Sequence, residues 1–125
     1  MKYSECTRRY FEAAAGAGVL EGPDVHRGAA GGAAQGAWVQ FDVRLNHRVI
    51  EAARFLAFGC PHTIAVSAWV VEHGLGPLTR AALPESVQQM SGRFDVPPEK
   101  RGRLLIIEDA WVAALADALQ RAAPL

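Results

Sequence analysis

The side chains best suited to chemistry in this 125-residue sequence are a cysteine and a histidine two positions apart, Cys60 and His62. Pro61 lies between them, and proline is common in the first turn of a helix. A thiol at a helix N-terminus should have a lowered pKa, because the helix dipole favours the thiolate. Cys60 is therefore the leading candidate for a reactive group.

Thiolate and imidazole are good ligands for zinc or iron, so Cys60 and His62 are candidates for a mononuclear metal site. A third ligand would have to come from elsewhere in the chain, such as His26. The alternative for His62, and the expected one, is an exposed residue of the first helical turn. The alternative for Cys60 is a half-buried structural cysteine without chemistry.

A thiol hydrolase or transferase would need a base beside Cys60, and the candidates are His62 and His73. Residues two apart on a helix do not face each other, and the sequence offers no third group to orient the base. We therefore expect a protein that is not an enzyme. The second cysteine, Cys6, should pack as a small apolar residue in the first helix, and both thiols should be free.

The charges of the chain balance, with 13 basic and 13 acidic residues, so no net field favours nucleic acid or an anionic membrane. Apolar residues make up 50% of the sequence, which is typical of a packed domain, and we expect a single domain over residues 1–125. The charged N-terminus is unlike a secretory signal, and the apolar stretches are too short to span a bilayer. These features favour a cytoplasmic protein.

Alternating apolar and polar residues predict two strands, 38–45 and 49–58. The Asn46-His47 pair between them suits a tight turn, so the strands should form an antiparallel hairpin. The preceding segment, 16–37, is rich in glycine and alanine and has few large apolar residues. We therefore expect it to be a mobile loop with one weak strand at most.

Helical spacing of apolar residues and flanking prolines predict helices before and after this hairpin. The result is an α+β fold in which a small antiparallel sheet of about three strands is packed by helices on one face. The three tryptophans should lie in the core. The helices are expected over residues 3–15, with Ser4 as the cap, and over 61–74, 78–82, 84–90 and 100–122; the tryptophans are Trp38, Trp69 and Trp111.

Three stretches of the sequence form a combined pattern. The central one is VIEAARFLAFGC, from Val49 to Cys60, which continues into Ile64-Ala65 and Trp69. The others are Tyr3-Ser4-Glu5 with Tyr10-Phe11, and Val96-Pro97-Pro98-Glu99-Lys100 with Glu108-Asp109-Ala110. Together they resemble the IscU/NifU N-terminal family of iron-sulfur cluster assembly scaffolds. The resemblance implies an IscU-like fold and binding of iron or an iron-sulfur cluster.

The resemblance also implies where the cluster site would lie, and most of its residues differ here. The family holds its cluster with three cysteines, an aspartate near the first and a histidine beside the third. Cys60 matches the second cysteine. An ungapped comparison places Gln35 at the first cysteine, Ala37 at the aspartate, and Gly102-Arg103 at the histidine-cysteine pair.

One thiolate does not suffice for a cluster that ordinarily takes four protein ligands, and Arg103 adds a fixed cation that repels iron. The resemblance therefore implies a degenerate cluster site. It leaves open whether Cys60 holds a cluster, a single iron or zinc ion, or no metal. Two chains in a homodimer could pool their Cys60 thiols.

Two functions stay open. In the first, the chain is a scaffold-like or accessory protein of iron-sulfur cluster assembly. In the second, it is a cluster-free interaction module or sulfur acceptor that binds a cysteine desulfurase or a chaperone, partners that the resemblance implies. The run Val96, Pro97, Pro98, Glu99 and Lys100 is similar to the family's chaperone-recognition loop.

Overall fold

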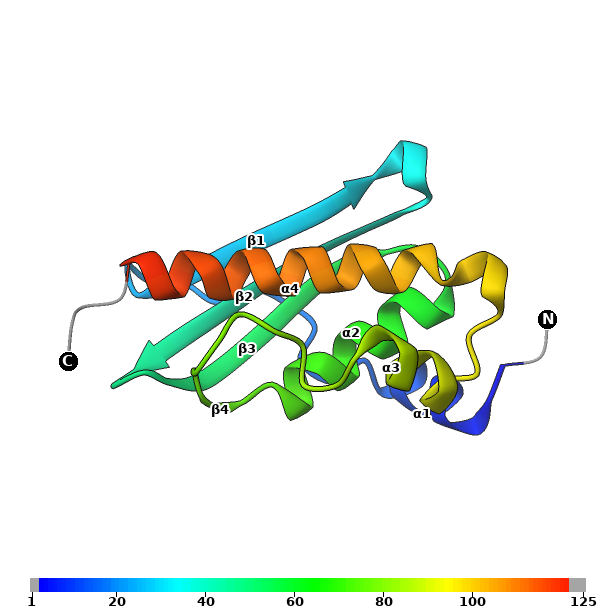
Figure 1. Cartoon of the computed structure of the whole chain (residues 1–125), viewed down its shortest axis with the longest axis horizontal. Coiled ribbons are helices and arrows are strands. Elements are labelled where there is room, and N and C mark those ends of the chain that lie inside the picture. Colours follow the sequence, from blue (N-terminus) through cyan, green and yellow to red (C-terminus); the bar gives the residue numbers. More distant parts are fainter. Residues whose placement is uncertain (1–2, 122–125) are drawn as a thin grey trace.

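A four-stranded antiparallel sheet is the central element of the computed structural model, which describes residues 3–121 (Figure 1). The α+β class is confirmed, with one strand more than the three expected. The predicted hairpin is confirmed too, because β2 and β3 pair directly through a turn at His47 and Arg48. In sheet order the strands are β1 (Val25–Gly32), β2 (Ala37–Asn46), β3 (Val49–Phe58) and β4 (Gly76–Pro77).

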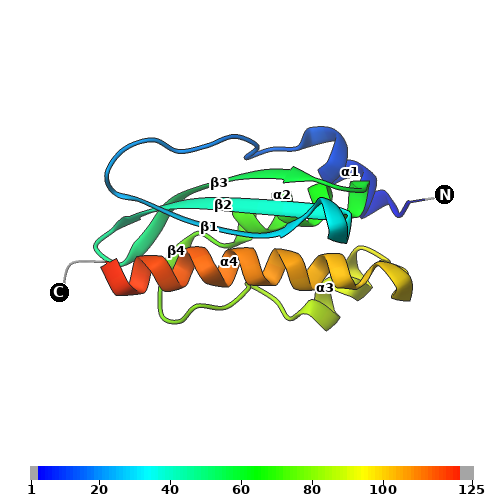
Figure 2. The same cartoon turned by 90° about the horizontal axis from the view of Figure 1, so that it is seen from above.

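Helices cover one face of this sheet. The long helix α4 lies along β1 and β2, while α2 lies against β3 and carries α1 on its outer side (Figure 2). The edge of the Trp111 ring on α4 meets the Phe41 ring on β2, with centroids 5.1 Å apart. The helices are α1 (Glu5–Ala13), α2 (Pro61–His73), α3 (Val87–Arg93) and α4 (Gly102–Arg121), with short 3-10 turns η1 (Ala33–Gln35) and η2 (Pro98–Lys100).

Two of the expected helices differ from the structure. Residues 78–82 form no helix, because the chain there continues from β4 and the Leu78 amide donates to the Arg48 carbonyl of the hairpin turn. The next helix, α3, begins at Val87 instead of Pro84. Ser86 and Gln89 form a reciprocal capping box, and this pair fixes the start of α3.

The segment 16–37, for which a loop with one weak strand at most was expected, contains β1, a regular strand of eight residues. Its small residues allow helix α4 to approach it closely at Gly28. A Cβ on Gly28 would lie 2.2 Å from the backbone nitrogen of Ala114 and 2.6 Å from the carbonyl oxygen of Ala110. Helix α4 therefore touches the strand at its backbone, and the helix supplies the apolar cover that the sequence of β1 lacks.

The opposite face of the sheet is partly covered by residues 14–24, which cross it between α1 and β1 (Figure 2). Trp38 lies on this face, half-buried and stacked on Phe58 with centroids 6.1 Å apart, so its expected core position is wrong. Trp69 and Trp111 are buried as predicted.

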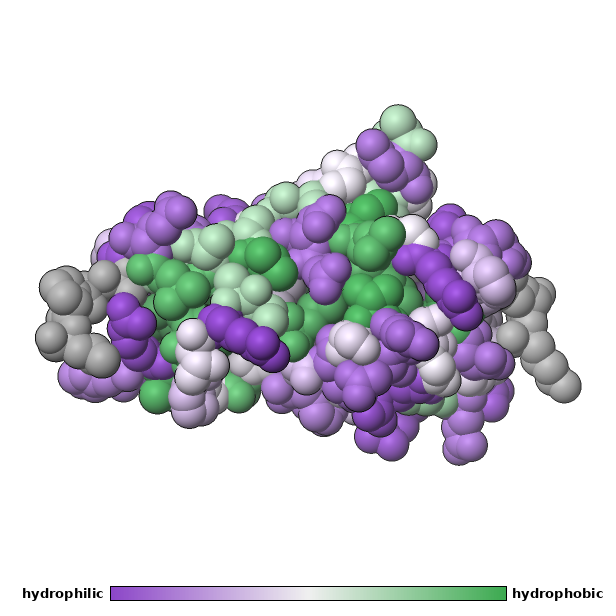
Figure 3. All heavy atoms as spheres, in the orientation of Figure 1, coloured by the Kyte–Doolittle hydropathy of each residue, from purple (hydrophilic) through white to green (hydrophobic). Residues whose placement is uncertain are grey.

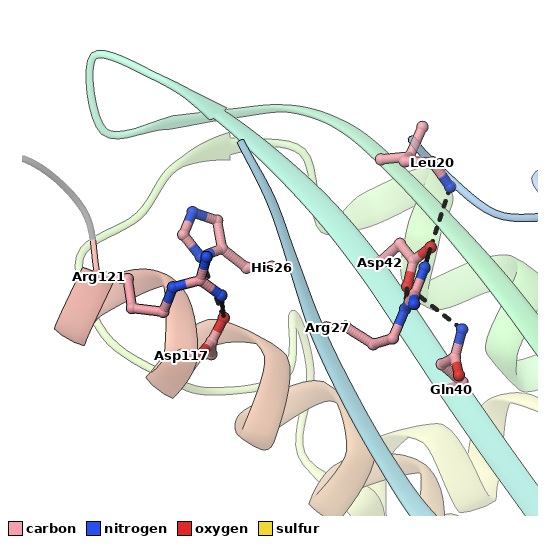
Figure 4. A network of polar contacts seen from close by, with 7 residues as sticks. All are labelled: Leu20, His26, Arg27, Gln40, Asp42, Asp117 and Arg121. Atoms are coloured by element: carbon pink, nitrogen blue, oxygen red, sulfur yellow. Dashed lines mark hydrogen bonds and ion pairs between the residues drawn. The ribbon is translucent and has the colours of Figure 1, made fainter. Parts of the chain in front are cut away.

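A buried carboxylate ties the crossing segment to the sheet (Figure 4). Asp42 accepts hydrogen bonds from Arg27 Nε at 2.7 Å and Nη2 at 2.9 Å, and from the backbone amide of Leu20 at 3.0 Å. Burial alone would raise the pKa of Asp42, but the hydrogen bonds from Arg27 and Leu20 outweigh it, so the pKa lies below its usual value. Asp42 is therefore ionised wherever the protein is folded near neutral pH.

Replacing Gly28 with alanine should destabilise the fold by about 3 kcal/mol, because the new methyl group would separate α4 from β1. Gly92→Ala is the matched control, since a Cβ there meets nothing within 4 Å. Urea unfolding followed by circular dichroism measures both variants. Equal stability of Gly28→Ala and the wild type would contradict backbone contact between α4 and β1.

Asp42→Asn should cost about 2 kcal/mol at pH 7, because the charged hydrogen bonds from Arg27 are lost. The folded pKa of Asp42 is depressed, so its contribution is complete above the unfolded pKa of about 3.9 and is lost as the pH falls through the folded pKa. The wild type and variant should therefore converge in acid.

Asp24→Asn serves as the control, since Asp24 pairs with Arg44 at an exposed position and should change stability by less than about 1 kcal/mol. Urea unfolding between pH 7 and acid measures the stability of the wild type, Asp42→Asn and Asp24→Asn. A cost of Asp42→Asn that persists unchanged in acid would show that the Asp42 charge is not its source.

Candidate functional site

Cys60 is the N-cap residue of α2, as predicted, and the preceding glycine is required for this position. Gly59 has a φ of +147°, and a Cβ there would lie 2.7 Å from the Thr63 hydroxyl. The chain therefore turns tightly from β3 into α2. The Cys60 sulfur comes to lie 3.8 Å from Thr63 Oγ1 and 4.0 Å from His62 Nδ1.

The surroundings of Cys60 favour its thiolate. Partial burial alone would raise the pKa of the thiol, but hydrogen bonds from the amide and hydroxyl of Thr63, the His62 amide and the charge of Lys100 together lower it. The predicted direction is therefore confirmed. The pKa of the other thiol, Cys6, shifts in the opposite direction, because burial raises it.

Two contributors to this thiolate, Thr63 and Lys100, were not predicted from the sequence. The available signal for Thr63 was its place three residues after an N-cap, where a short hydroxyl side chain returns toward the cap. The signal for Lys100 was weaker. This residue is forty positions from Cys60 in the sequence, at the end of η2, and it acts on the thiol through its charge.

His62 is buried, with 2% of its surface exposed, so the expectation of an exposed helical residue is wrong. The Tyr3 and His62 rings meet edge to face, with centroids 4.9 Å apart. Lys100 Nζ lies 5.4 Å from the centroid of the Tyr3 ring. Burial, followed by the charges of Lys100 and Arg103, lowers the pKa of His62, and Asp95 opposes this. His62 is therefore neutral at pH 7.

The other two candidate histidines lie elsewhere. His26 is part of β1, where its Nδ1 lies 3.1 Å from Asp117 near the end of α4 (Figure 4). His73 ends α2, about 16 Å along the helix from His62, and its Nδ1 lies 3.0 Å from the Trp69 carbonyl oxygen. His26 is therefore wrong as a third ligand, and His73 is wrong as a base for Cys60.

The positions that the resemblance assigned to the cluster lie in two parts of the chain, the loop between β1 and β2 and the start of α4 (Figure 1). Gln35 ends η1, buried Ala37 begins β2, and Arg103 belongs to the first turn of α4. A Cβ on Gly36 would lie 3.8 Å from Arg103 Nη2, so the loop between β1 and β2 meets the start of α4. We use the term cationic thiol site for Cys60, His62, Lys100 and Arg103.

The segment Val96 to Lys100 connects α3 with α4. Val96 is buried, Pro97 is extended, and Pro98, Glu99 and Lys100 form η2. Glu99 and Pro98 are exposed. The candidate chaperone loop therefore has an accessible turn, and its last residue belongs to the cationic thiol site.

The residues of this site do not fit an iron-sulfur cluster held by one chain. Cluster iron prefers several anionic thiolates, whereas the site has one thiol and two cations, and Arg103 is always charged. Within residues 3–121, no group of three or more histidine, cysteine, aspartate or glutamate side chains is placed to hold a metal ion. Further ligands would have to come from another molecule.

No helix within residues 3–121 has the length and apolar character that a bilayer span requires.

Comparison with known proteins identifies the family. The NifU-like N terminal domain family matches residues 2–123, and the chain belongs to it. The iron-sulfur cluster assembly scaffold protein IscU of Haemophilus influenzae is 31% identical over 120 residues, which are 94% of this chain and 95% of that protein. IscU of Escherichia coli K12 is also 31% identical over 120 residues, at 94% of each chain.

A solved structure supports the same fold. The crystal structure of the N-terminal part of a nitrogen-fixing NifU-like protein from Brucella abortus superposes with a TM-score of 0.72 and covers 95% of each chain. Its sequence identity to this chain is 14%, so the likeness concerns the fold alone. The IscU/NifU-like α+β fold predicted from the sequence is therefore confirmed.

Iodoacetamide should alkylate Cys60 with a pH midpoint below that of Cys6, because hydrogen bonds and charge favour the Cys60 thiolate while burial disfavours that of Cys6. Thr63→Val should raise the Cys60 midpoint, since it removes the hydroxyl beside the sulfur. Mass spectrometry of alkylated peptides measures both thiols across a pH series.

Ser67→Ala is the control for this change, because it removes a hydroxyl one turn further along α2 that bonds the Thr63 carbonyl. Its Cys60 midpoint should stay at the wild-type value. A wild-type midpoint of Cys60 at or above that of Cys6 would contradict the stabilised thiolate.

Proposed function

We propose that this chain acts in iron-sulfur cluster assembly as a scaffold-type protein, without turnover catalysis, and that Cys60 is its reactive group. The observation that carries this proposal is the Cys60 thiol at the N-terminus of α2 in a fold of the NifU-like N terminal domain family. The relatives that match nearly the whole chain are named as scaffolds of this process. The lowered pKa of Cys60 supplies the thiolate that sulfur and iron chemistry require.

In this proposal, the ligands that the chain lacks come from a second molecule. One thiolate leaves a cluster short of ligands, and a second copy of the chain would contribute another Cys60. A small thiol is the other source. A single iron or zinc ion would need fewer ligands from a second molecule. Cys60 and His62 would supply two, since Sγ and Nδ1 lie 4.0 Å apart and His62 is neutral.

The proposed partners are a cysteine desulfurase and a chaperone. Large apolar side chains are exposed beside the site: Phe58, 46% exposed, precedes Cys60 by two residues, and Leu105, 53% exposed, follows Arg103 by two. Apolar side chains also gather along the middle of one face, with hydrophilic residues around them (Figure 3). Exposed apolar surface of this kind favours protein contacts. The turn at Pro98 and Glu99 is the proposed contact for the chaperone.

A second candidate function is that of a sulfur acceptor without a cluster. It is favoured by the combination of a stabilised thiolate with the absence of further cysteines beyond Cys6 in the sequence. The Cys60 thiolate would attack the outer sulfur of a donor persulfide, and the donor thiol would leave with the electrons of the broken S–S bond. The product is a persulfide on Cys60.

Anaerobic reconstitution with iron, sulfide and reductant tests the first function against the second. Wild type should retain iron and acid-labile sulfide, and Cys60→Ala should retain neither. Cys6→Ala is the matched control, because Cys6 lies on α1 and is not part of the site. If wild type and Cys60→Ala both stay empty, scaffold function on this chain is contradicted and the acceptor function takes its place.

Restoring the family residues should restore cluster binding. The variant Gln35→Cys, Ala37→Asp, Arg103→Cys should hold more iron and sulfide per chain than the wild type, because it replaces a cation with a thiolate and adds two anionic ligands. Elemental analysis and the visible absorption of the reconstituted protein measure this. The control carries only Arg103→Ala, which removes the cation without adding a ligand.

An unchanged iron content in the triple variant would contradict the placement of the family's ligand positions at Gln35, Ala37 and Arg103. Circular dichroism should accompany the measurement, because Ala37 is fully buried and an aspartate there has to be accommodated.

A further inference from the structure

We use the term strap for residues 75–84, the segment that leaves the end of α2 and passes beside α4 on its way to α3 (Figure 1). Two hydrogen bonds hold it in place. The Leu78 amide donates to the Arg48 carbonyl at 2.8 Å, and Trp111 Nε1 on α4 donates to the Ala82 carbonyl at 3.1 Å. The strap is therefore tied at two points, and the space between it and α4 is preformed.

A cavity of about 220 Å³ lies beneath the strap. Four buried apolar side chains form its inner wall, namely Ile50, Leu78, Trp111 and Leu115. Apolar side chains gather along α4 and the strap in the space-filling view as well (Figure 3). A cavity of about 150 Å³ in a protein interior is enough to hold a benzene ring. The strap cavity therefore has room for a single ring or a short branched chain, and it is too small for a peptide segment.

The rim of this cavity carries a positive charge. Thr79 and Arg80 line the cavity and are exposed. Arg80 makes no hydrogen bond or ion pair within residues 3–121, and no acidic side chain from that part of the chain lines the cavity. A guanidinium with free donors binds a carboxylate through two parallel hydrogen bonds. An apolar wall with an unpaired arginine at the rim therefore suits a small organic carboxylate.

We propose that the strap cavity binds a small organic carboxylate, with its apolar ring or chain against Trp111 and Leu115 and its carboxylate on Arg80. Phenylacetate represents the class of ligand. The site lies at the end of α2 opposite to Cys60, about 20 Å away along a helix of thirteen residues. The inference therefore goes beyond cluster assembly, and it holds whether or not the chain retains iron.

Binding of the carboxylate should be visible at Trp111, because the indole forms part of the wall and its Nε1 hydrogen bond ties the strap to α4. Titration of the intact chain with phenylacetate, followed by the Trp111 Nε1–H signal in a proton–nitrogen NMR spectrum, measures it. We expect the signal to move saturably, with a Kd of about 1 mM or lower.

Variants of Arg80 test the role of the guanidinium. Arg80→Gln should weaken phenylacetate binding by about tenfold, because it removes the charge and the paired donors. Arg80→Lys should recover part of the loss, since it keeps the charge without the planar fork. Arg8→Gln is the matched control, because Arg8 is an exposed arginine of α1 and does not line the cavity. It should bind phenylacetate like the wild type.

A neutral ligand separates the carboxylate contact from the apolar contact. Benzyl alcohol, which has the ring without the charge, should bind the wild type about tenfold more weakly than phenylacetate and should not distinguish the wild type from Arg80→Gln. Circular dichroism checks that the variants are folded. The absence of a saturable Trp111 shift with phenylacetate, or equal phenylacetate affinity in the wild type and Arg80→Gln, overturns the proposal. Retention of iron and sulfide is a separate measurement, so scaffold function stands or falls independently.

Discussion

The arrangement of the site depends on the contact between the backbones of β1 and α4. Gly28 allows the helix to approach the strand so closely that a single methyl group would meet Ala110 and Ala114. A helix that touches a strand at this distance has little freedom to shift, because the interior is close-packed. The start of α4, which carries Arg103, is thereby held beside the loop between β1 and β2.

The second fixed point is the turn from β3 into α2. Gly59 can adopt a positive φ and leaves room for Thr63. The Cys60 sulfur therefore lies against Thr63 in the first turn of α2. Together, the two fixed points bring a thiol and two cations to one end of the sheet. The fold is that of its family, whereas the residues gathered here are one thiol and two cations. This explains why family membership is clear although the site does not fit a cluster held by one chain.

Local patterns in the sequence were enough to predict several elements. The alternation in β2 and β3 predicted their hairpin, and Pro61 after Cys60 predicted the start of α2, because both signals depend on neighbouring residues. At most a weak strand was expected where β1 lies, and the reason is physical. Its glycines and alanines carry no apolar signal of their own, and the helix that packs on it, α4, contacts Gly28 through residues about eighty positions later.

The parts of the site that depend on distant residues were also missed. His62 is buried because Tyr3, from the start of the chain, packs on it, and no helical pattern around His62 contains that information. The charge on Cys60 comes from Lys100 for the same reason. Arg103 was predicted as a cation at a ligand position, and that assignment stays a prediction; its place beside the loop of Gln35 and Ala37 follows from Nη2, which would lie 3.8 Å from a Cβ on Gly36.

The central claim is that one chain of this family member has too few ligands to hold a cluster alone. Native mass spectrometry after anaerobic reconstitution tests it most directly, because it reads the metal content of each assembly separately. We expect iron and sulfide only in species that contain two chains or an added thiol, and monomers without a cluster. A monomer that carries a complete iron-sulfur cluster on residues of this chain alone would contradict the claim.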